Sequence, residues 1–384
     1  MAAGPPPTRG LTSAHRDGAS DPVRAHLEEL LAEARSRAEE DADLTALWDE
    51  LDRTVHGGKR FRGRLVLGAH AALGGQHPQA AVVVAAAFEM LHAAFLVHDD
   101  LIDHDTVRRG GPNLMAVMLQ VATDRGLSSE RAAQFAEAAA VLAGDLALGL
   151  AHECLAAAPA PASVRPALQA LFGRMLAVSV RGELADVRGA LDPHGVDVAG
   201  ALETAAAKTA MYSFQAPLQA GALLAAADTE VLGALDEVGL HLGTAFQLAD
   251  DLSGVFAPQE VTGKSALSDL REGKATTLML LARTLPVWSS VSTHVGRPDL
   301  AEDEAVTVRR ALARSTATTQ VLDRGHAEIS AALTQASEGP LPGPARRLVV
   351  DLAGTVRAEL DKAAAFVAEA RGVTEDRVPG TAQR

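Results

Sequence analysis

The stretch AAVVVAAAFEMLHAAFLVHDDLIDHD, residues 80–105, decides the fold, because it joins a long apolar run to a dense acidic end. The apolar part, residues 80–97, is nearly long enough to span a bilayer, but Glu89 and His92 lie inside it and Asp99 and Asp100 follow it at once. Charged side chains are costly in lipid, whereas a helix that is apolar on all sides is typical of a protein core. We therefore interpret the run as a central core helix and expect no membrane span.

The composition favours an all-α protein. Hydrophobic residues make up 48% of the 384 residues, aromatic residues only 3%, and alanine and leucine carry most of the apolar content; both are strong helix formers. The formal charge of −14 argues against nucleic acid as a partner, because phosphate contacts need basic surface. A single cysteine, Cys154, excludes an intramolecular disulfide and a thiolate metal cluster, and it fits a cytoplasmic location.

Turn signals predict one large helical domain, residues 22–371, between two tails, residues 1–21 and 372–384. The first tail is rich in proline, glycine, serine and charge, which is typical of disorder. Besides the core helix, we expect helices over 22–51, 59–73, 113–157, 163–190, 197–227 and 230–253, an irregular segment at 254–273, and further helices from 275 to 371. No shift in composition marks a second domain.

Two acidic clusters each end an apolar helix. They are Asp99, Asp100, Asp103 and Asp105 after the core helix, and Asp250 with Asp251 far downstream. A charge run is more often a solvated helix end, but aspartates are unfavourable at a helix C-terminus, where the macrodipole is negative, and like charges one turn apart repel. A bound cation removes both objections, and oxygen ligands that share phosphates suit Mg²⁺. The pair of clusters predicts two acidic walls facing each other across a helical cavity.

Basic residues accompany the acidic clusters along the chain. They are Lys59, Arg60, Arg62, Arg108, Arg109, Lys208, Lys264 and Lys274. Each alone is more often a solvated surface cation, but Lys59 and Arg62 open a predicted helix, whose N-terminus is a ready anion site, and arginine suits bidentate phosphate contact. Together the set predicts sites for two diphosphates, one held through metal and one held directly. The chain has no P-loop of the required spacing, which excludes the usual nucleotide phosphate chemistry.

The chain carries an ordered series of motifs: Gly58-Lys59-Arg60-Phe61-Arg62, His92, Asp99-Asp100-Leu101-Ile102-Asp103, Arg108-Arg109-Gly110, Lys208-Thr209, Phe246-Gln247-Leu248-Ala249-Asp250-Asp251, Gly263-Lys264 and Asp269-Leu270-Arg271-Glu272-Gly273-Lys274. With these motifs in this order, the sequence resembles the trans-isoprenyl diphosphate synthase (polyprenyl synthetase) family. Within the family it most resembles a bacterial geranylgeranyl diphosphate synthase. The motifs span residues 56–276. The resemblance implies a single-domain helical bundle with a deep central cavity, usually assembled as a homodimer.

The resemblance also implies a role for each matched residue. The catalytic metal ligands would be Asp99 and Asp103 for two magnesium ions and Asp250 for a third, assisted by Asp100, Asp251 and Asp269. The allylic diphosphate would be bound by Arg108, Lys208 and Lys264, with Thr209 and Gln247 nearby, and isopentenyl diphosphate by Lys59, Arg62, His92 and Arg109. Lys208 would also be catalytic, and Lys274 would be a further substrate-binding residue. The implied reaction ionises the allylic diphosphate, adds the isopentenyl double bond to the carbocation and then loses a proton.

The helix that leads into the first aspartate motif carries a set of three residues that bear on product length: Leu91, Ala94 and Phe95. Residues one turn apart share a helix face, so residues one or more turns before Asp99 are expected to line the floor of the cavity for the growing chain. In the family, a large aromatic residue just before this motif tends to stop the chain early. Small Ala94 beside bulky Phe95 therefore predicts geranylgeranyl diphosphate, with farnesyl and longer products as the alternatives.

One position departs from the family pattern: Gly254 stands where the second motif usually has a third aspartate. In the family the first aspartate of the second motif, which is Asp250 here, is the main metal ligand of that motif. We therefore expect activity to survive and the affinity for metal to be the property that Gly254 affects. A class I terpene cyclase would need Ser or Thr at Gly254 and Glu at Pro258, and would have no use for Lys59 with Arg62. A non-catalytic synthase subunit often lacks an aspartate motif, and this chain keeps the first one intact.

Overall fold

Helices dominate the computed structural model, which describes residues 21–37, 41–192, 195–259 and 267–372. In chain order they are α1 (Pro22–Ser36), α2 (Ala42–His56), α3 (Phe61–Ala72), α4 (Pro78–Ile102), α5 (Leu114–Asp124), α6 (Ser129–Ala157), α7 (Arg165–Leu191), α8 (Val198–Ala205), the π-helix η1 (Ala206–Gln215), α9 (Ala216–Leu224), α10 (Thr229–Phe256), α12 (Ser268–Glu272), α13 (Thr277–Arg283), α14 (Trp288–Val291), α15 (Glu302–Arg314), α16 (Thr316–Glu338) and α17 (Gly343–Gly372). Within those ranges the only strands are β1 (Val107–Arg108) and β2 (Gly111–Pro112), which form a small antiparallel hairpin. The predicted all-α class is confirmed.

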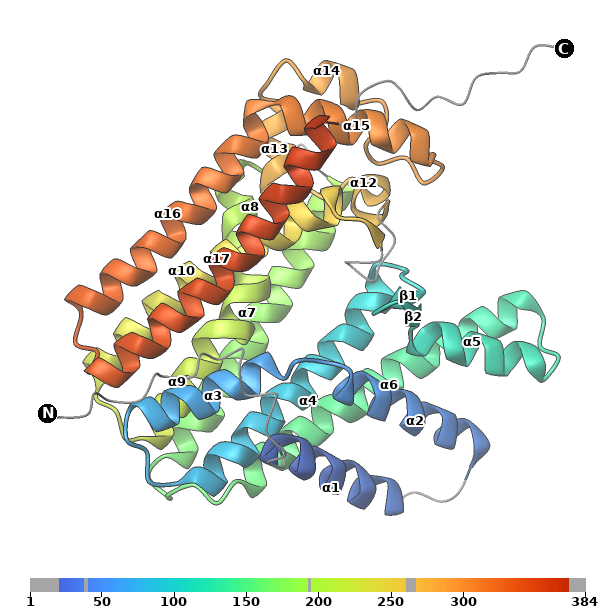
Figure 1. The fold of residues 1–384 in the computed structure, drawn as a ribbon. Helices are drawn as coiled ribbons and strands as arrows, with labels where there is room; N and C mark the ends of the chain where they lie inside the picture. Colours follow the sequence, from blue (N-terminus) through green and yellow to red (C-terminus); the bar gives the residue numbers. More distant parts are fainter. Residues whose placement is uncertain (1–20, 38–40, 193–194, 260–266, 373–384) are drawn as a thin grey trace, which may run out of the picture.

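Helix α4 is the buried centre of one half of the molecule (Figure 1). Most of its residues from Ala80 to Ala94 are buried, with Val84 and Leu91 fully buried and Phe88 1% exposed, and it packs against α3 and α6. Both α4 and α6 are long and apolar enough to cross a membrane, but 78% of the most apolar window of α4 is buried inside the protein, against 50% for α6. The burial of α4 agrees with its interpretation as a core helix.

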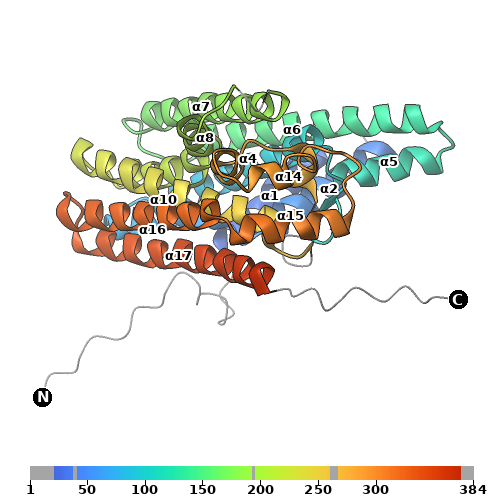
Figure 2. The same cartoon turned by 90° about the horizontal axis from the view of Figure 1, so that it is seen from above.

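The helices lie in layers, which the view from above makes clear (Figure 2). Helices α7 and α8 lie along one side, α16 and α17 along the opposite side, and α4 and α10 lie between them. One hydrophobic cluster surrounds α10, α16 and α17, with Leu248 and Val356 fully buried, and a second surrounds α4, α3 and α9. Helices α4 and α10 each carry an acidic C-terminal end, so this layering sets the position of the functional site.

Several predicted helices are divided in the structure. The segment 22–51 forms α1 and part of α2, although neither proline nor glycine marks the break. The segment 113–157 divides into α5 and α6 near Gly126, whose φ is 81°. The segment 197–227 divides into α8, η1 and α9, and the π-helix ends just before Pro217, which lacks a backbone N–H for the regular helical bond. The predicted tails, residues 1–20 and 373–384, lie outside the described residues.

Candidate active site

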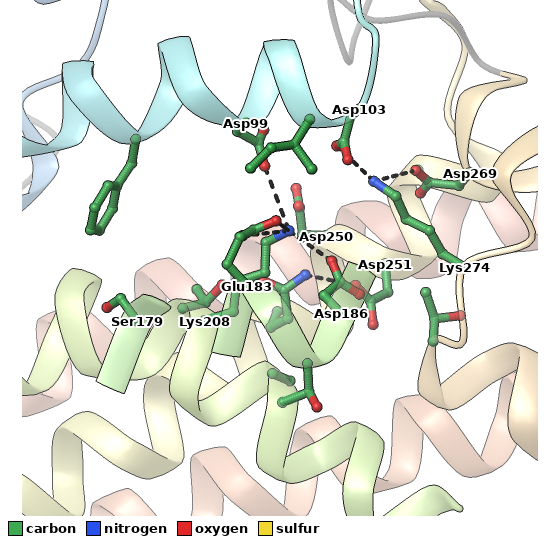
Figure 3. A pocket seen from close by; sticks show the side chains of 18 of the residues that line it. Asp99, Asp103, Ser179, Glu183, Asp186, Lys208, Asp250, Asp251, Asp269 and Lys274 are labelled. Atoms are coloured by element: carbon green, nitrogen blue, oxygen red, sulfur yellow. Dashed lines mark hydrogen bonds and ion pairs between the residues drawn. The ribbon is translucent and has the colours of Figure 1, made fainter. Parts of the chain in front are cut away.

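A cavity of about 830 Å³ lies between α4 on one side and α7, η1 and α10 on the other. Asp99 and Asp103 point into it from α4 (Figure 3). Asp250 and Asp251 face them from the end of α10. The structure therefore brings the two acidic clusters together across one cavity, as the sequence predicts.

Lys208, on η1, connects the opposite walls of this cavity. Its Nζ lies 2.7 Å from Oδ2 of Asp186, 3.0 Å from Oε2 of Glu183 and 3.5 Å from Oδ1 of Asp99. Burial disfavours the charged ammonium, but these carboxylates outweigh burial and raise the pKa of Lys208. Lys208 is thus held as a cation between α7 and the first aspartate of α4.

Lys274 makes a second ionic link across the cavity (Figure 3). Its Nζ lies 2.9 Å from Oδ2 of Asp103, 3.2 Å from Oε2 of Glu272 and 3.7 Å from Oδ1 of Asp269. Burial disfavours this ammonium too, and the carboxylates, Asp269 first, raise its pKa well above the ordinary lysine value. The loop after α12 is therefore tied to the end of α4.

Arg108 supplies the third cation, from the hairpin that follows α4. Its Nη2 donates to Oδ2 of Asp99 at 2.9 Å, and its Nε donates to Oδ1 of Asp100 at 2.7 Å. The turn between the two strands consists of Arg109 and Gly110, both with positive φ (56° and 77°), as a two-residue hairpin turn requires. Arg108 stands just before this turn, and its side chain contacts the two aspartates near the end of α4.

The second acidic wall is organised by a chain of hydrogen bonds from η1 to α10. Thr209 Oγ1 donates to Oε1 of Gln247, and Nε2 of Gln247 donates to Oδ1 of Asp251 at 2.7 Å. Burial raises the pKa of Asp251 to about 8, even though the bond from Gln247 lowers it, and the neighbouring Asp250 raises it further. Asp251 is therefore a buried carboxyl group whose ionised form needs a nearby cation.

The facing carboxylates suit a magnesium ion that also carries phosphate oxygens and water. Asp99, Asp103 and Asp250 offer carboxylate oxygens from both walls of one cavity, which is the ligand type that Mg²⁺ prefers. Among the described residues, no three His, Cys, Asp or Glu side chains are already arranged around a common metal position. Mg²⁺ is usually held by one or two carboxylates together with substrate phosphates rather than by an all-protein cage.

Gly254, which departs from the aspartate pattern, lies directly against Asp269. Oδ2 of Asp269 occupies the space that a β-carbon at position 254 would need, and Cγ of Asp269 would lie 3.1 Å from that atom. A carboxylate from α12 therefore reaches the place where the side chain of a third aspartate on α10 would begin.

A second basic group lines the same cavity around Arg62. Arg62 donates from Nη2 to Oγ of Ser213 at 2.7 Å, and its Cζ lies 4.4 Å from the ring centroid of Tyr212, a cation–π distance. His92 lines the cavity beside it, and its Nδ1 is buried without a hydrogen-bond partner among the described residues. Burial, followed by the charge of Arg62, lowers the pKa of His92 well below the ordinary imidazole value.

Arg109 joins this group and Lys59 does not. Arg109 lines the cavity and donates from Nη1 to the carbonyl oxygen of Thr54 at 3.1 Å. Its guanidinium fills the space that a β-carbon on Gly57 would need, so the glycine permits this close approach. Lys59 is exposed and lies outside the cavity lining, and Lys264 lies outside the described residues.

Of the three residues predicted to limit product length, only Phe95 lines the cavity. Its ring packs edge-on against Tyr212, with ring centroids 5.0 Å apart. Leu91 and Ala94 are fully buried and lie outside the cavity lining, because they face the packed second cluster around α4. The sequence analysis placed Ala94 beside the growing chain, and the structure differs on this point.

Sequence reasoning missed three residues that the structure adds to the site. Glu183 and Asp186 on α7 both hold Lys208, and Tyr212 contacts both Arg62 and Phe95. The acidic pair lies three residues apart between basic residues, a pattern that fits an ordinary solvated helix face equally well. Tyr212 is the only tyrosine in the chain and follows Lys208 by one helical turn, a signal that could have identified it.

The fold and the two facing aspartate walls define a class of all-α proteins that includes a crystallised geranylgeranyl pyrophosphate synthase from Corynebacterium glutamicum, solved with isoprenyl diphosphate and magnesium. That structure is 26% identical in sequence, aligns with a TM-score of 0.77, and the match covers 92% of this chain and 98% of the other. A family model described as polyprenyl synthetase matches residues 45–294, and the chain belongs to this family. The resemblance seen in the sequence is thereby confirmed.

Two mycobacterial relatives differ in their products. A (2E,6E)-farnesyl diphosphate synthase of Mycobacterium tuberculosis is 39% identical over 232 residues, which cover 59% of this chain and 58% of that protein. The match therefore spans less than two thirds of that relative's length. A geranylgeranyl diphosphate synthase of the same organism is 32% identical over 290 residues, which cover 73% of each chain.

Proposed function

We propose that this chain is a magnesium-dependent prenyltransferase that condenses isopentenyl diphosphate with an allylic diphosphate to form a linear trans-polyprenyl diphosphate. The observation that carries the proposal is the pairing of Asp99 and Asp103 with Asp250 across one cavity. The separate basic group at Arg62 and Arg109 offers a second anion site in the same cavity. One diphosphate to ionise and one to hold in place need two such sites.

The first site binds and activates the allylic diphosphate. Arg108 and Lys208 lie beside Asp99, so their charges can contact the diphosphate and stabilise it as it departs. We assign Lys274, Thr209 and Gln247 to the same site, and Lys264 as the family resemblance implies. Asp99, Asp103 and Asp250 would hold Mg²⁺, about three ions as the family resemblance implies. When bound, Mg²⁺ would supply Lewis-acid stabilisation of the charge on the leaving group.

The second site holds isopentenyl diphosphate with its double bond near the ionising carbon. We assign Arg62, His92 and Arg109, which line the cavity, to this site, and Lys59 as the family resemblance implies. Tyr212 and Phe95 line the same cavity and pack ring against ring. Holding the two reactants together lowers the entropic cost of their reaction, and the apolar walls exclude water from the carbocation.

We propose geranylgeranyl diphosphate as the main product. The relatives support both farnesyl and geranylgeranyl synthesis, so the argument rests on the cavity. Phe95 is the bulky α4 side chain one turn before Asp99, and it is the one phenylalanine of α4 that lines the cavity. A farnesyl or longer product is the alternative.

We further propose that the chain acts as a cytoplasmic homodimer, with residues 22–371 as its one domain. Exposed apolar side chains gather on α6 and α7, which lie on the same side of the molecule (Figure 2): Val141, Leu142, Val180, Leu184 and Leu191 are 42%, 62%, 56%, 59% and 83% exposed. Val180 and Leu184 also line the cavity, so a second copy that covers this face would close the cavity to water.

Light scattering of the purified chain tests the dimer. Leu142→Glu combined with Leu191→Glu should give a monomer. Val350→Glu on α17, which is 56% exposed on the opposite side, should leave the dimer intact. A monomeric wild type would contradict the proposal.

Diphosphate release by the purified chain tests the reaction. It should require isopentenyl diphosphate, an allylic diphosphate and Mg²⁺ together. Release from the allylic diphosphate alone would indicate a cyclase, and no release under any condition would indicate a non-catalytic subunit.

A further inference from the structure

Glu89 is a buried carboxylate in the middle of apolar helix α4, and the roles assigned above do not include it. It is 5% exposed, between Phe88 and Met90, which are 1% and 0% exposed. Burying a carboxylate is costly unless it is hydrogen-bonded. Oε1 of Glu89 accepts the backbone N–H of Gly63 at 2.6 Å, and Glu89 does not line the cavity.

This bond falls on the first turn of α3, which has no other cap. The N-cap residue Arg60 has φ 48° and makes no side-chain capping bond. The first N–H groups of a helix have no partner within the helix. The carboxylate of Glu89 accepts the N–H of Gly63 and also interacts with the backbone N–H of Arg62. Helix α4 thus caps α3 from outside; burial raises the pKa of Glu89, and the charge of Arg62 and the backbone hydrogen bonds oppose that rise.

The contact corrects one expectation from the sequence. The N-terminus of α3 was expected to offer its own N–H groups to a phosphate. Glu89 already accepts the N–H of Gly63 in the first turn, so that N–H is not available to a diphosphate.

The same turn carries the arginine of the second anion site. Arg60 is tied by its Nε to Oδ2 of Asp21 at 2.6 Å, and Gly63 is tied to Glu89 at the same distance. Arg62 lies between these two anchors and extends to Ser213 and Tyr212. The direction of the Arg62 side chain therefore depends on a backbone that is fixed on both sides.

We propose that Glu89 is a positioning residue that fixes the first turn of α3 and thereby aims Arg62 at the diphosphate of isopentenyl diphosphate. The proposal rests on the function proposed above and deepens it. Glu89 itself touches neither substrate. Its effect should appear in the binding of one substrate only, which distinguishes it from a buried residue that merely stabilises the fold.

Glu89→Ala removes the carboxyl group that accepts the N–H of Gly63. Glu89→Asp keeps a carboxyl group on a side chain that is one methylene shorter. We expect Glu89→Ala to raise KM for isopentenyl diphosphate about tenfold, which corresponds to about 1.4 kcal/mol, while KM for the allylic diphosphate changes less than about twofold. Glu89→Asp should give a smaller shift of the same kind, and Glu89→Gln, which keeps an acceptor oxygen, should lie near wild type. Hydrogen exchange at the amides of Arg62 and Gly63 should speed up in Glu89→Ala.

Glu328→Ala is the matched control. Glu328 is also buried, at 7% exposed, but it pairs with His241 and Arg324 away from the cavity. The Glu328→Ala variant should have a lower melting temperature than the wild type, with the ratio of the two KM values unchanged. Equal rises in both KM values for Glu89→Ala and Glu89→Asp would overturn the proposal. Calorimetric binding of isopentenyl diphosphate to each variant decides the same question without turnover, so an inactive wild type would count against the proposed reaction and leave this test intact.

Discussion

An oxygen of the Asp269 carboxylate occupies the space that a β-carbon on Gly254 would need. The two residues come from different helices, α12 and α10. The same carboxylate faces Lys274, whose ammonium also contacts Asp103 on the opposite wall. The absence of a side chain at Gly254 therefore leaves the space that the Asp269 carboxylate occupies.

Gly254→Ala should disturb this feature by pushing the Asp269 carboxylate away. We expect the Mg²⁺ concentration for half-maximal activity to rise by about tenfold, because a misplaced carboxylate weakens a shared metal site. Gly233→Ala on the same helix has open space around the new β-carbon and should leave the metal requirement unchanged. An unchanged requirement in Gly254→Ala would show that Asp269 does not contribute to metal binding.

Removal of the facing aspartates should abolish most of the activity. Asp99→Ala, Asp103→Ala and Asp250→Ala should each lower kcat by at least about a hundredfold, the effect of losing one strong stabiliser of transition-state charge. Asp145→Ala on α6, whose side chain is 64% exposed, is the control. Full activity in any one of the three variants would remove that residue from the metal site.

The two diphosphate sites should separate in steady-state kinetics. Arg62→Ala should mainly raise KM for isopentenyl diphosphate, whereas Lys208→Ala should mainly raise KM for the allylic diphosphate. The reason is position, since Lys208 contacts Asp99 and Arg62 contacts Ser213 and Tyr212. Each substrate is varied while the other is saturating, and equal effects on both KM values would argue against the assignment.

Product length should respond to Phe95. Phe95→Ala opens the cavity next to Tyr212 and should lengthen the product by at least one five-carbon unit. Ala94→Phe adds volume at a fully buried position, where overpacking costs about 1–3 kcal/mol, so we expect a lower melting temperature. Chromatography of dephosphorylated products measures the first effect, and an unchanged length in Phe95→Ala would place the limit elsewhere.

The sequence predicted the parts of the site that depend on local pattern. Asp99, Asp103 and Asp250 were recognisable because each cluster ends an apolar helix, and the structure brings them together. The burial of α4 followed from its long, predominantly apolar run.

Other parts depended on contacts between distant segments. The role of Glu183 in holding Lys208 comes from the packing of α7 against η1, and the cap from Glu89 comes from the packing of α4 against α3. Ala94 was misplaced because spacing alone does not show which face of a fully buried helix adjoins a cavity rather than a neighbouring helix.

The central claim is that the chain joins isopentenyl diphosphate to an allylic diphosphate, and one measurement tests it most directly. The purified protein is incubated with carbon-labelled isopentenyl diphosphate and farnesyl diphosphate, with Mg²⁺ or with excess chelator, and the products are dephosphorylated and separated by chromatography. We predict that the label enters a linear twenty-carbon alcohol only when Mg²⁺ is present. Label that remains entirely in isopentenyl diphosphate with Mg²⁺ present, for farnesyl diphosphate and for shorter allylic primers alike, would contradict the account.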